Sequence, residues 1–525
     1  MITPETHMPS GWAFCSVADI SELIRGITYK KEQSSKSPAP DLMPILRANN
    51  INGGLNFDGL VYVPRSIVEK VQSIKQGDII FAMSSGSLHL VGKSAQAQTN
   101  WDGSCGAFCA ILRIDQPIFS KFLAFLFQGN AFRRKISETA KGSNINNLKR
   151  EHILEHQLAL PPLAEQRRIV AKIEELFSDL DKGIENLKLA QAQLKVFRQA
   201  LLKHAIEGKL TDRWRAANNK KLKSGKQLYA DIQSKRRKIW EEAQLLKFKE
   251  SGKEPPKDWK EKYIEPVAHE NVKLSPLPEG WAIASMDSLT SRITSGSRDW
   301  QQYYGSGSGV FIMAQNVRPG SFDMRFRQSV NPPTTDSSCE RSLVACDDLL
   351  VTIVGANTGD VCRVPEDLKE HYVCQSVALM RPVESATGRF LDKYFNSLGG
   401  GQLHFRRYLY GAGRPHLSFD QLRMTPVLLP PLAEQTVIVE IVEEQFSVID
   451  QLESDIATNL QKAEALRQSI LKKAFAGHLV PQDPADEPAS ELLARIRVER
   501  ETKLAEAKAE TKSKSKPKKV STAKV

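Results

Sequence analysis

The sequence predicts an α+β protein in which two mixed α/β domains are joined by two long helices that form an antiparallel coiled coil, with an internal pseudo-twofold duplication. Three observations predict this fold class. The segment Leu160–Gln166 (LPPLAEQ) recurs 269 residues later as Leu429–Gln435. An apolar pattern with the period of an α-helix follows each copy. About 150 residues of weakly similar sequence precede each copy, which indicates a variable domain attached to each shared helix.

Other motifs obey the same repeat distance. It joins Pro9–Trp12 (PSGW) to Pro278–Trp281 (PEGW), and Leu148 to Leu417. One chance match is easily found in a long chain, whereas a single distance that holds across separate motifs indicates duplication. Divergent domains on a common frame suggest two versions of one task.

Composition sets the class of protein. The chain has 525 residues, too many for one hydrophobic core, and a net charge of +12. Its 41% hydrophobic and 26% charged residues are typical of a globular protein. No apolar run approaches the roughly 20 residues that span a bilayer, and Met1–Glu5 does not begin a secretory signal. Seven cysteines spread over this length favour a reducing compartment. We therefore expect a cytoplasmic protein with no membrane partner.

The motifs divide the chain into six segments. Much of the positive charge falls in the linker and the tail, so net charge alone is poor evidence for a polyanionic partner. The tail from Lys503 is low in apolar residues and is expected to lack regular structure. The predicted segments are the first variable domain (1–158), the first long helix (159–209), a charged helical linker (210–276), the second variable domain (277–427), the second long helix (428–480), and a short helix with a lysine-rich tail (481–525).

Each shared segment reads as one long amphipathic helix. Pro162 suits a first helical turn, where its missing N–H is not needed. About 45 residues make a helix of roughly 65–70 Å, which must bury its apolar stripe against a partner. The simplest partner is the other copy, and the domain between them favours antiparallel pairing. The positions expected in the contact are Ile169, Ile173, Leu176, Leu180, Ile184, Leu187, Leu194 and Leu201 in the first helix, and Ile438, Val442, Ile449, Leu452, Ile456, Leu460, Leu466 and Ile470 in the second.

The variable domains contain signals for both strands and helices. Short apolar runs after turn residues predict strands, and longer amphipathic runs predict helices. The glycine-rich segment Gly305–Gly309 is most simply a flexible loop. Strands are expected at 77–82, 109–113, 347–352 and 377–381, and helices at 119–132, 227–249 and 390–403.

Motifs for catalysis or metal binding are incomplete. The segment Ser87–Ser94 ends like a phosphate-binding loop but has serine where that loop needs glycine. Asn331–Thr334 (NPPT) lacks the aromatic residue of the Asn-Pro-Pro-aromatic motif of methyltransferases that act on amino groups. Cys105 and Cys109 have no second ligand pair at zinc-finger spacing. The sequence therefore predicts a chain without catalytic, cofactor-binding or metal-binding residues of its own.

Polar and basic loop residues suit recognition of nucleic acid instead. Arg can read guanine, Asn or Gln can read adenine, and Ser, Thr or Lys can hold phosphates. Each residue alone is more simply a solvated loop residue, but corresponding loops of both domains share this character. The candidates are Arg47, Asn49, Asn50, Ser85, Ser87, His89, Lys93, Lys141, Ser143 and Asn144 in the first domain, and Gln315, Asn316, Arg318, Asn357, Thr358, Arg406, Arg407, Arg414 and His416 in the second.

These features together resemble a known family. Two copies of a Pro-Pro-Leu-Ala-Glu-Gln motif that opens a long helix, each after a variable domain that starts Pro-x-Gly-Trp, are similar to the specificity subunits of type I restriction–modification enzymes. Gly413–Leu417 (GRPHL) also resembles a turn of that family. The first domain departs from this turn, with Ile145–Leu148 (INNL) in its place. The resemblance covers roughly residues 8–500.

The resemblance implies a function. Each variable domain would be a target recognition domain that reads one half of a bipartite, asymmetric sequence of double-stranded DNA, and the helix pair would set the spacer. The partners would be two modification subunits, which methylate adenine, and restriction subunits, which cleave DNA. S-adenosylmethionine, ATP and Mg²⁺ would be bound by these partners and not by this chain.

Two other classes of protein remain open at this point. A coiled-coil scaffold that spaces two protein-binding domains would fit the helices equally well, and failure of the intact complex to bind DNA would favour it. A self-contained methyltransferase or nuclease is the third reading. Methyl transfer by the purified chain with S-adenosylmethionine would support that one.

Overall fold

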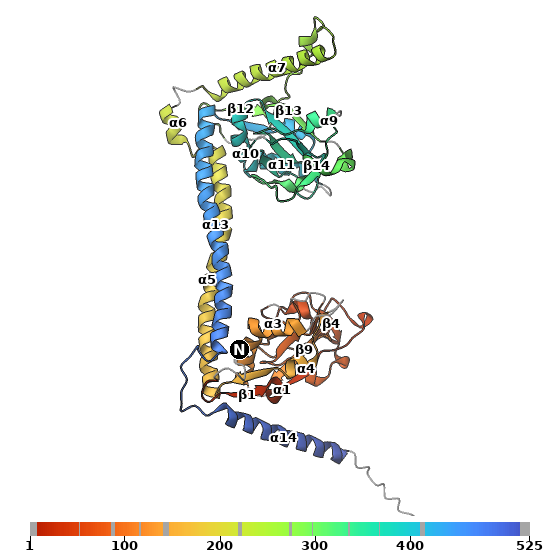
Figure 1. Cartoon of the computed structure of the whole chain (residues 1–525), viewed down its shortest axis with the longest axis vertical. Coiled ribbons are helices and arrows are strands. Elements are labelled where there is room, and N and C mark those ends of the chain that lie inside the picture. The colour runs from red at the N-terminus through yellow and green to blue at the C-terminus, as the bar shows by residue number, and fades with distance from the viewer. Residues whose placement is uncertain are drawn as a thin grey trace, which may run out of the picture. The chain divides into compact units, whose positions relative to one another are not determined.

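The computed structural model describes residues 8–514 except 52, 86–89, 115–116, 140–145, 219–222, 272–275, 297, 334–336, 367 and 410–414. The chain divides into two compact units. The first comprises Met1–Leu187 with Ala457–Val525, and the second comprises Lys188–Ile456. Each unit contains one mixed α/β domain and half of each long helix (Figure 1).

The first domain is built on a four-stranded antiparallel sheet of order β2-β9-β5-β7 and a three-stranded sheet of order β4-β3-β8. In the smaller sheet, β3 pairs antiparallel with β4 and parallel with β8. Two short pairs, β1-β11 and β6-β10, complete it. The strands are β1 Ala13–Ser16, β2 Ser21–Arg25, β3 Leu42–Leu46, β4 Val61–Pro64, β5 Ile79–Ala82, β6 Ser84–Ser85, β7 Ser94–Gln96, β8 Ser104–Cys105, β9 Cys109–Ile114, β10 Asn146–Asn147 and β11 Gln157–Leu160.

The second domain repeats this topology although its sequence aligns poorly with the first. Its sheets have the orders β13-β21-β18-β19 and β17-β14-β20, and β12 pairs with β22 as β1 pairs with β11. The strands are β12 Ala282–Ser285, β13 Thr290–Ser295, β14 Tyr304–Ile312, β15 Val317–Arg318, β16 Ser321–Phe322, β17 Gln328–Val330, β18 Leu349–Thr352, β19 Val361–Arg363, β20 His371–Val373, β21 Val377–Pro382 and β22 Pro426–Leu429. The fold class predicted from the sequence is confirmed.

Where one domain helix is expected, each domain has two. Gly129 separates α2 from α3, and Ser397–Gly400 separate α10 from α11; a helix interior disfavours the glycines in these breaks. The domain helices are α1 Val17–Ile20, α2 Pro117–Gln128, α3 Asn130–Thr139, α4 Arg150–Leu154, α8 Met286–Leu289, α9 Ser337–Ser342, α10 Gly388–Asn396, α11 Gly401–Leu409 and α12 Phe419–Arg423.

The segment Gly305–Gly309 is not a loop, because it lies within β14. Close packing explains two of its glycines. A Cβ atom at Gly307 would come within 2.3 Å of the Val330 carbonyl oxygen on the neighbouring strand, and one at Gly309 within 2.9 Å of the same oxygen. The pairing is irregular between Tyr304 and Gly309, which both pair with Val330.

A buried tryptophan joins the first domain to its long helix, α5 (Leu163–Ile206). The indole Nε1 of Trp12 donates a hydrogen bond of 2.9 Å to Oε2 of Glu165, and both side chains are buried. Gln166 donates from Nε2 to the Pro161 carbonyl at 2.8 Å, which satisfies a backbone group in the turn before the helix. The Glu-Gln part of the repeated motif thus holds the helix entry.

The second copy repeats this arrangement at α13 (Leu432–Ala474). Trp281 Nε1 donates to Glu434 Oε2, also at 2.9 Å, and Gln435 Nε2 donates to the Pro430 carbonyl at 2.9 Å. One difference separates the copies. The second carboxylate oxygen of Glu434 accepts bonds from Thr211 at 2.7 Å and Arg215 at 2.9 Å. The equivalent oxygen of Glu165 has no hydrogen-bond partner in the described part of the chain.

The long helices pair with antiparallel, pseudo-twofold contacts (Figure 1). In the first unit, Arg467 of α13 forms an ion pair with Asp181 of α5 and lies 4.3 Å above the ring of Phe177. In the second unit, Arg198 of α5 forms an ion pair with Asp450 and lies 4.4 Å above the ring of Phe446. Each residue of one set stands 269 positions from its counterpart in the other. Such reciprocal contacts are those of a twofold interface.

The buried stripe of the coiled coil differs from the expected one at two positions. Leu452 and Leu466 are 45% and 51% exposed, so the expectation that they lie in the contact is wrong. Val439, Ala463 and Leu471 are buried, and Val439 and Leu471 belong to the hydrophobic cores that the helices share with the domains. A 3.6-residue period leaves a choice between adjacent positions, and the geometry of the helix crossing decides between them.

A shorter helix follows each long one. They are α7 (Gly225–Glu250) and α14 (Ala489–Lys514), and α6 (Asp212–Asn218) precedes α7. The amide of Gly225 donates to the Gly280 carbonyl at 2.6 Å, and that of Ala489 to the Gly11 carbonyl at 2.8 Å, so both helices start at the same place on their domains. The expectation that regular structure ends before Lys503 is wrong, because α14 continues to Lys514. The Ala-, Glu- and Lys-rich composition there has high helix propensity.

His156 makes the stability of the first domain pH-dependent. It is 4% exposed, meets the edge of the Phe132 ring, and neither ring nitrogen has a hydrogen-bond partner among the described residues. Burial, with a smaller effect of Lys135, lowers the pKa of His156 to about 4. Because the unfolded chain takes up this proton near pH 6.5 and the folded chain does not, stability decreases as the pH falls from about 6.5 towards 4.

We expect this single group to remove on the order of 3 kcal/mol of stability across that window. The check is the urea midpoint of the wild type and of His156→Leu at pH 7 and pH 5, and the variant should lose less stability on acidification. His269→Leu is the matched control, since His269 is exposed. Equal acid sensitivity of the wild type and His156→Leu would contradict the prediction.

Candidate nucleic-acid interface

In the first domain, three backbone hydrogen bonds bring together loops that are far apart in the sequence. Leu148 donates to the Met83 carbonyl at 2.7 Å, and Met83 donates to the Phe108 carbonyl at 2.8 Å. Gly106, in the same turn as Phe108, donates to the Leu46 carbonyl at 2.9 Å. The loops after β3, β5 and β8 and the segment before α4 therefore meet at one edge of the domain. We call this arrangement the loop ladder.

The second domain has the same loop ladder. Leu417 donates to the Ile353 carbonyl at 3.0 Å, and Ile353 donates to the Ser376 carbonyl at 2.9 Å. Cys374 donates to the Ile312 carbonyl at 2.9 Å. The backbone frame is thus common to both domains, although the sequences of the loops differ.

The side chains presented along the two ladders are different. In the first domain the exposed residues after β3 are Arg47 and Asn49, and Ser84 donates to Asn147 where β6 pairs with β10. In the second, Gln315 and His416 are exposed at the corresponding places. Thr358 joins two of the loops there, since its hydroxyl donates to the Gly355 carbonyl at 2.6 Å and to the Pro415 carbonyl at 3.2 Å. Asn357 lies half-buried in the same loop.

Two candidates have a structural role. Asn50 and Asn316 are each 1% exposed, so the prediction that they contact bases is wrong. Both donors of the Asn50 amide bind the carbonyls of Asn56 and Asp58, at 3.0 and 2.9 Å. The Asn316 amide binds two carbonyls of the loop after β16 in the same way, at 2.8 and 2.7 Å. A buried amide with both donors used fixes a loop and has none left for a base edge.

The remaining candidates that the structure describes differ in burial. Arg318 is half-buried and donates to the carbonyls of Ala314 and Val317 at 3.4 and 3.2 Å. Arg406 and Arg407 are exposed near the end of α11, and Arg407 lies 3.9 Å from Glu270. Ser85 and Lys93 are half-buried in the first domain. Outside the described residues lie Ser87, His89, Lys141, Ser143, Asn144 and Arg414.

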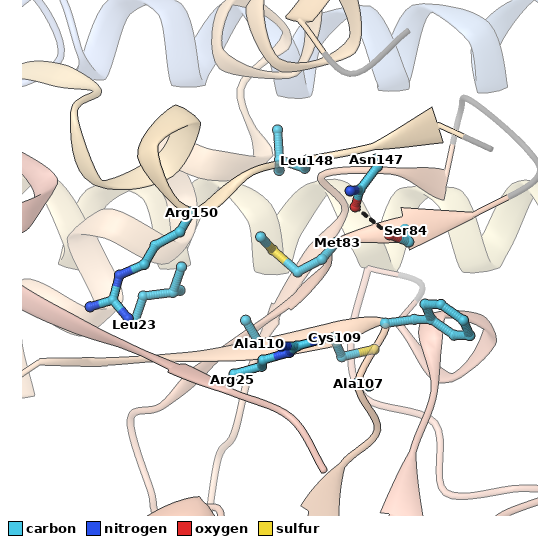
Figure 2. A pocket seen from close by; sticks show the side chains of 11 residues that line it. Leu23, Arg25, Met83, Ser84, Ala107, Cys109, Ala110, Asn147, Leu148 and Arg150 are labelled. Carbon is cyan, nitrogen blue, oxygen red and sulfur yellow. Dashed lines mark hydrogen bonds between the residues drawn. The ribbon is translucent and has the colours of Figure 1, made fainter. Parts of the chain in front are cut away.

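Sequence reasoning missed three residues of the first ladder: Arg25, Phe108 and Arg150. They line a hollow beside Ser84 and Asn147 (Figure 2). The sequence carries no signal for Phe108, because an aromatic residue directly before a buried strand is normally interpreted as part of the hydrophobic core. Arg25 and Arg150 stand alone in their segments, where a single arginine reads as a solvated surface residue.

Two buried thiols of the first domain are not suited to catalysis. Burial raises the pKa of the Cys15 and Cys109 thiols to about 12, which keeps them from acting as thiolates at neutral pH. Over the described ranges, there is no cluster of three or more His, Cys, Asp or Glu side chains that could hold a metal ion. In the same part of the chain, no helix is both long and apolar enough to cross a membrane.

The fold and the ladders define a duplicated recognition protein, with one loop frame used twice and different side chains on each copy. Residues 9–189 match the family described as type I restriction modification DNA specificity domain. The chain is 30% identical to the EcoKI specificity subunit of Escherichia coli K12 over 509 residues, which covers 94% of this chain and 96% of that protein. It is also 30% identical to the StySPI specificity subunit of Salmonella potsdam over 512 residues, with the same coverage of both proteins.

A solved structure supports the fold. A chain from a structure titled for complex assembly and conformational transition of the type I R-M system matches with a TM-score of 0.62 and 18% identity. The match covers 90% of this chain and all of that one. The chain belongs to the family of type I restriction enzyme specificity subunits.

Proposed function

We propose that this chain is the DNA-recognition subunit of a type I restriction–modification complex. Each domain reads one half of a bipartite, asymmetric target, and the paired helices set the spacer between the halves. The observation that carries the proposal is the loop ladder, because the same backbone frame presents different side chains in the two domains. Because the backbone frame is the same, both domains approach DNA in the same way, and their side chains decide which bases each domain accepts.

We infer that the chain itself is non-catalytic and binds no cofactor. Two modification subunits would carry S-adenosylmethionine and methylate adenine, and restriction subunits would supply ATP- and Mg²⁺-dependent translocation and cleavage. Since the substrate is the DNA of the cell or incoming DNA, we place the complex in the cytoplasm.

The exposed apolar residues of the helices support docking of the modification subunits there. In the second unit, Leu189 and Val196 of α5 and Val448 of α13 are exposed, and so is Leu246 of α7. In the first unit, Val498 of α14 is exposed. Exposed apolar side chains grouped on helices are typical of protein interfaces. The long helices and the helices α7 and α14 are therefore the surfaces we assign to these partners.

The test is a methylome of a host with and without this chain, in the presence of its modification subunits. We expect a chain-dependent adenine methylation motif in two parts separated by a fixed spacer. Exchange of residues 9–158 for those of a relative should change one part and leave the other. Methylation at every sequence, or a motif that persists without the chain, would contradict the proposal.

A further inference from the structure

A hollow of about 420 Å³ lies at the centre of the first loop ladder (Figure 2). Arg25 reaches it from the end of β2 and Arg150 from the start of α4, while the bonded pair Ser84 and Asn147 lies at another edge. The described residues that line it are Leu23, Arg25, Met83, Ser84, Ala107, Phe108, Cys109, Ala110, Asn147, Leu148 and Arg150.

Phe108 is held rigidly but left exposed. Its carbonyl accepts hydrogen bonds from the amides of Met83 at 2.8 Å and Ser84 at 3.2 Å, which fixes the backbone. Its side chain is nevertheless 66% exposed. At the corresponding position of the second ladder stands Ser376, whose carbonyl accepts from Ile353. The shared backbone frame does not need an aromatic residue at this position. The phenylalanine therefore serves recognition by the first domain alone.

The charge of the hollow favours DNA as its occupant. No hydrogen bond or ion pair joins the guanidinium group of Arg25 or Arg150 to any residue that the structure describes. The lining residues that the structure describes include no carboxylate. Two cations that line the same hollow as an exposed aromatic ring suit phosphates next to a base.

We infer that Phe108 is an apolar base contact of the first domain and that Arg25 and Arg150 hold the phosphates beside it. The inference rests on the proposed function. The base that suits Phe108 is thymine, whose 5-methyl group is the apolar feature of the major groove. Phe108 is thus a specificity-determining residue with no equivalent in the second domain, where Ser376 occupies its place.

The experiment uses the complete complex of this chain with its modification subunits. Methylation rates are measured on DNA in which each base pair of the target is changed in turn. We expect Phe108→Ser to reduce discrimination about tenfold at one thymine-containing pair of the half-site read by the first domain, with the other half-site and the spacer unchanged. Phe108→Leu should keep part of the preference. Val71→Ser is the control, an exposed apolar residue of the same domain that is not in the hollow.

The arginines should behave differently. Arg25→Gln and Arg150→Gln should weaken binding equally for all sequences, and each should reduce the slope of log affinity against log salt by about one. The inference is overturned if Phe108→Ser discriminates every base pair as the wild type does, or if it slows methylation equally on all sequences. A wild-type complex with no defined half-sites would instead overturn the proposed function.

Discussion

Inserting one heptad after Leu187 and another after Ile456 is expected to lengthen the DNA spacer and to leave both half-sites unchanged. The two positions are 269 residues apart and so are equivalent under the duplication. Antiparallel pairing on either side of the insertions keeps its register, because both helices gain the same length. The pairs Arg467–Asp181 and Arg198–Asp450 would therefore remain.

The size of the effect follows from helix geometry. Seven residues add about 10.5 Å, which corresponds to at most about three base pairs at 3.4 Å each. They also add nearly two whole turns, so the buried faces stay aligned. The measurement is methylation mapping of a host that carries the variant.

The control is a heptad in one helix only. That change shifts one apolar stripe against the other and should destabilise the pair instead of changing the spacer. If the double insertion alters bases within a half-site, or leaves the spacer as it was, the helices do not set the distance between the two halves.

Replacing Trp12 with phenylalanine is expected to destabilise the protein by about 2–4 kcal/mol, more than the equivalent Trp281→Phe. The reason is the difference between two buried carboxylates. Glu165 would lose its hydrogen bond from Trp12, and its other oxygen has no partner in the described part of the chain. Glu434 would keep Arg215 and Thr211. A buried charge without partners is the more costly case.

The pH dependence gives a second readout of this prediction. Burial already raises the pKa of Glu165, and the bond from Trp12 opposes that rise. Without the indole the folded-state pKa rises further above the unfolded value, so the loss of stability of Trp12→Phe relative to the wild type should become smaller as the pH falls and Glu165 takes up a proton. The destabilisation from His156 is common to both proteins and cancels in this difference. Urea unfolding at pH 7 and pH 5 measures this.

Adding Glu165→Gln to Trp12→Phe should restore part of the loss at pH 7, because an amide carries no charge to be buried. Equal losses for Trp12→Phe and Trp281→Phe would show that the hydrogen bond to the carboxylate does not decide the effect.

The sequence by itself determined the duplication and the long helices. The motif at Leu160–Gln166 and its repeat, followed by apolar residues of period 3.6, are local signals that survive without tertiary context. Both helices form where they were expected, at α5 and α13. The family was also recognisable from these motifs, and the comparisons confirm it. A charged helix was also predicted at 227–249 in the lysine-rich linker, and it is α7.

The exact faces of elements required the tertiary structure. Leu466 fits the helical period but is exposed, and Gly305–Gly309 has the composition of a loop but lies within β14. In both cases a neighbouring element decides the outcome. The crossing of two helices determines which face of α13 is buried, and the close approach of a strand determines the conformation of the glycine-rich segment. The sequence of a single segment does not specify which element will pack against it.

Only the tertiary structure showed that the two variable domains share one topology and one loop ladder. Backbone hydrogen bonds make this frame, and because every residue except proline can donate them, sequences can diverge while the frame stays the same. For the same reason the sequence could not separate Asn50, whose buried amide fixes a loop, from the exposed Asn49 beside it. Nor could it bring Phe108 into one hollow with two arginines from distant segments. The burial of a side chain and its hydrogen-bond partners are set by the folded structure. They decide which polar residues remain free to contact DNA.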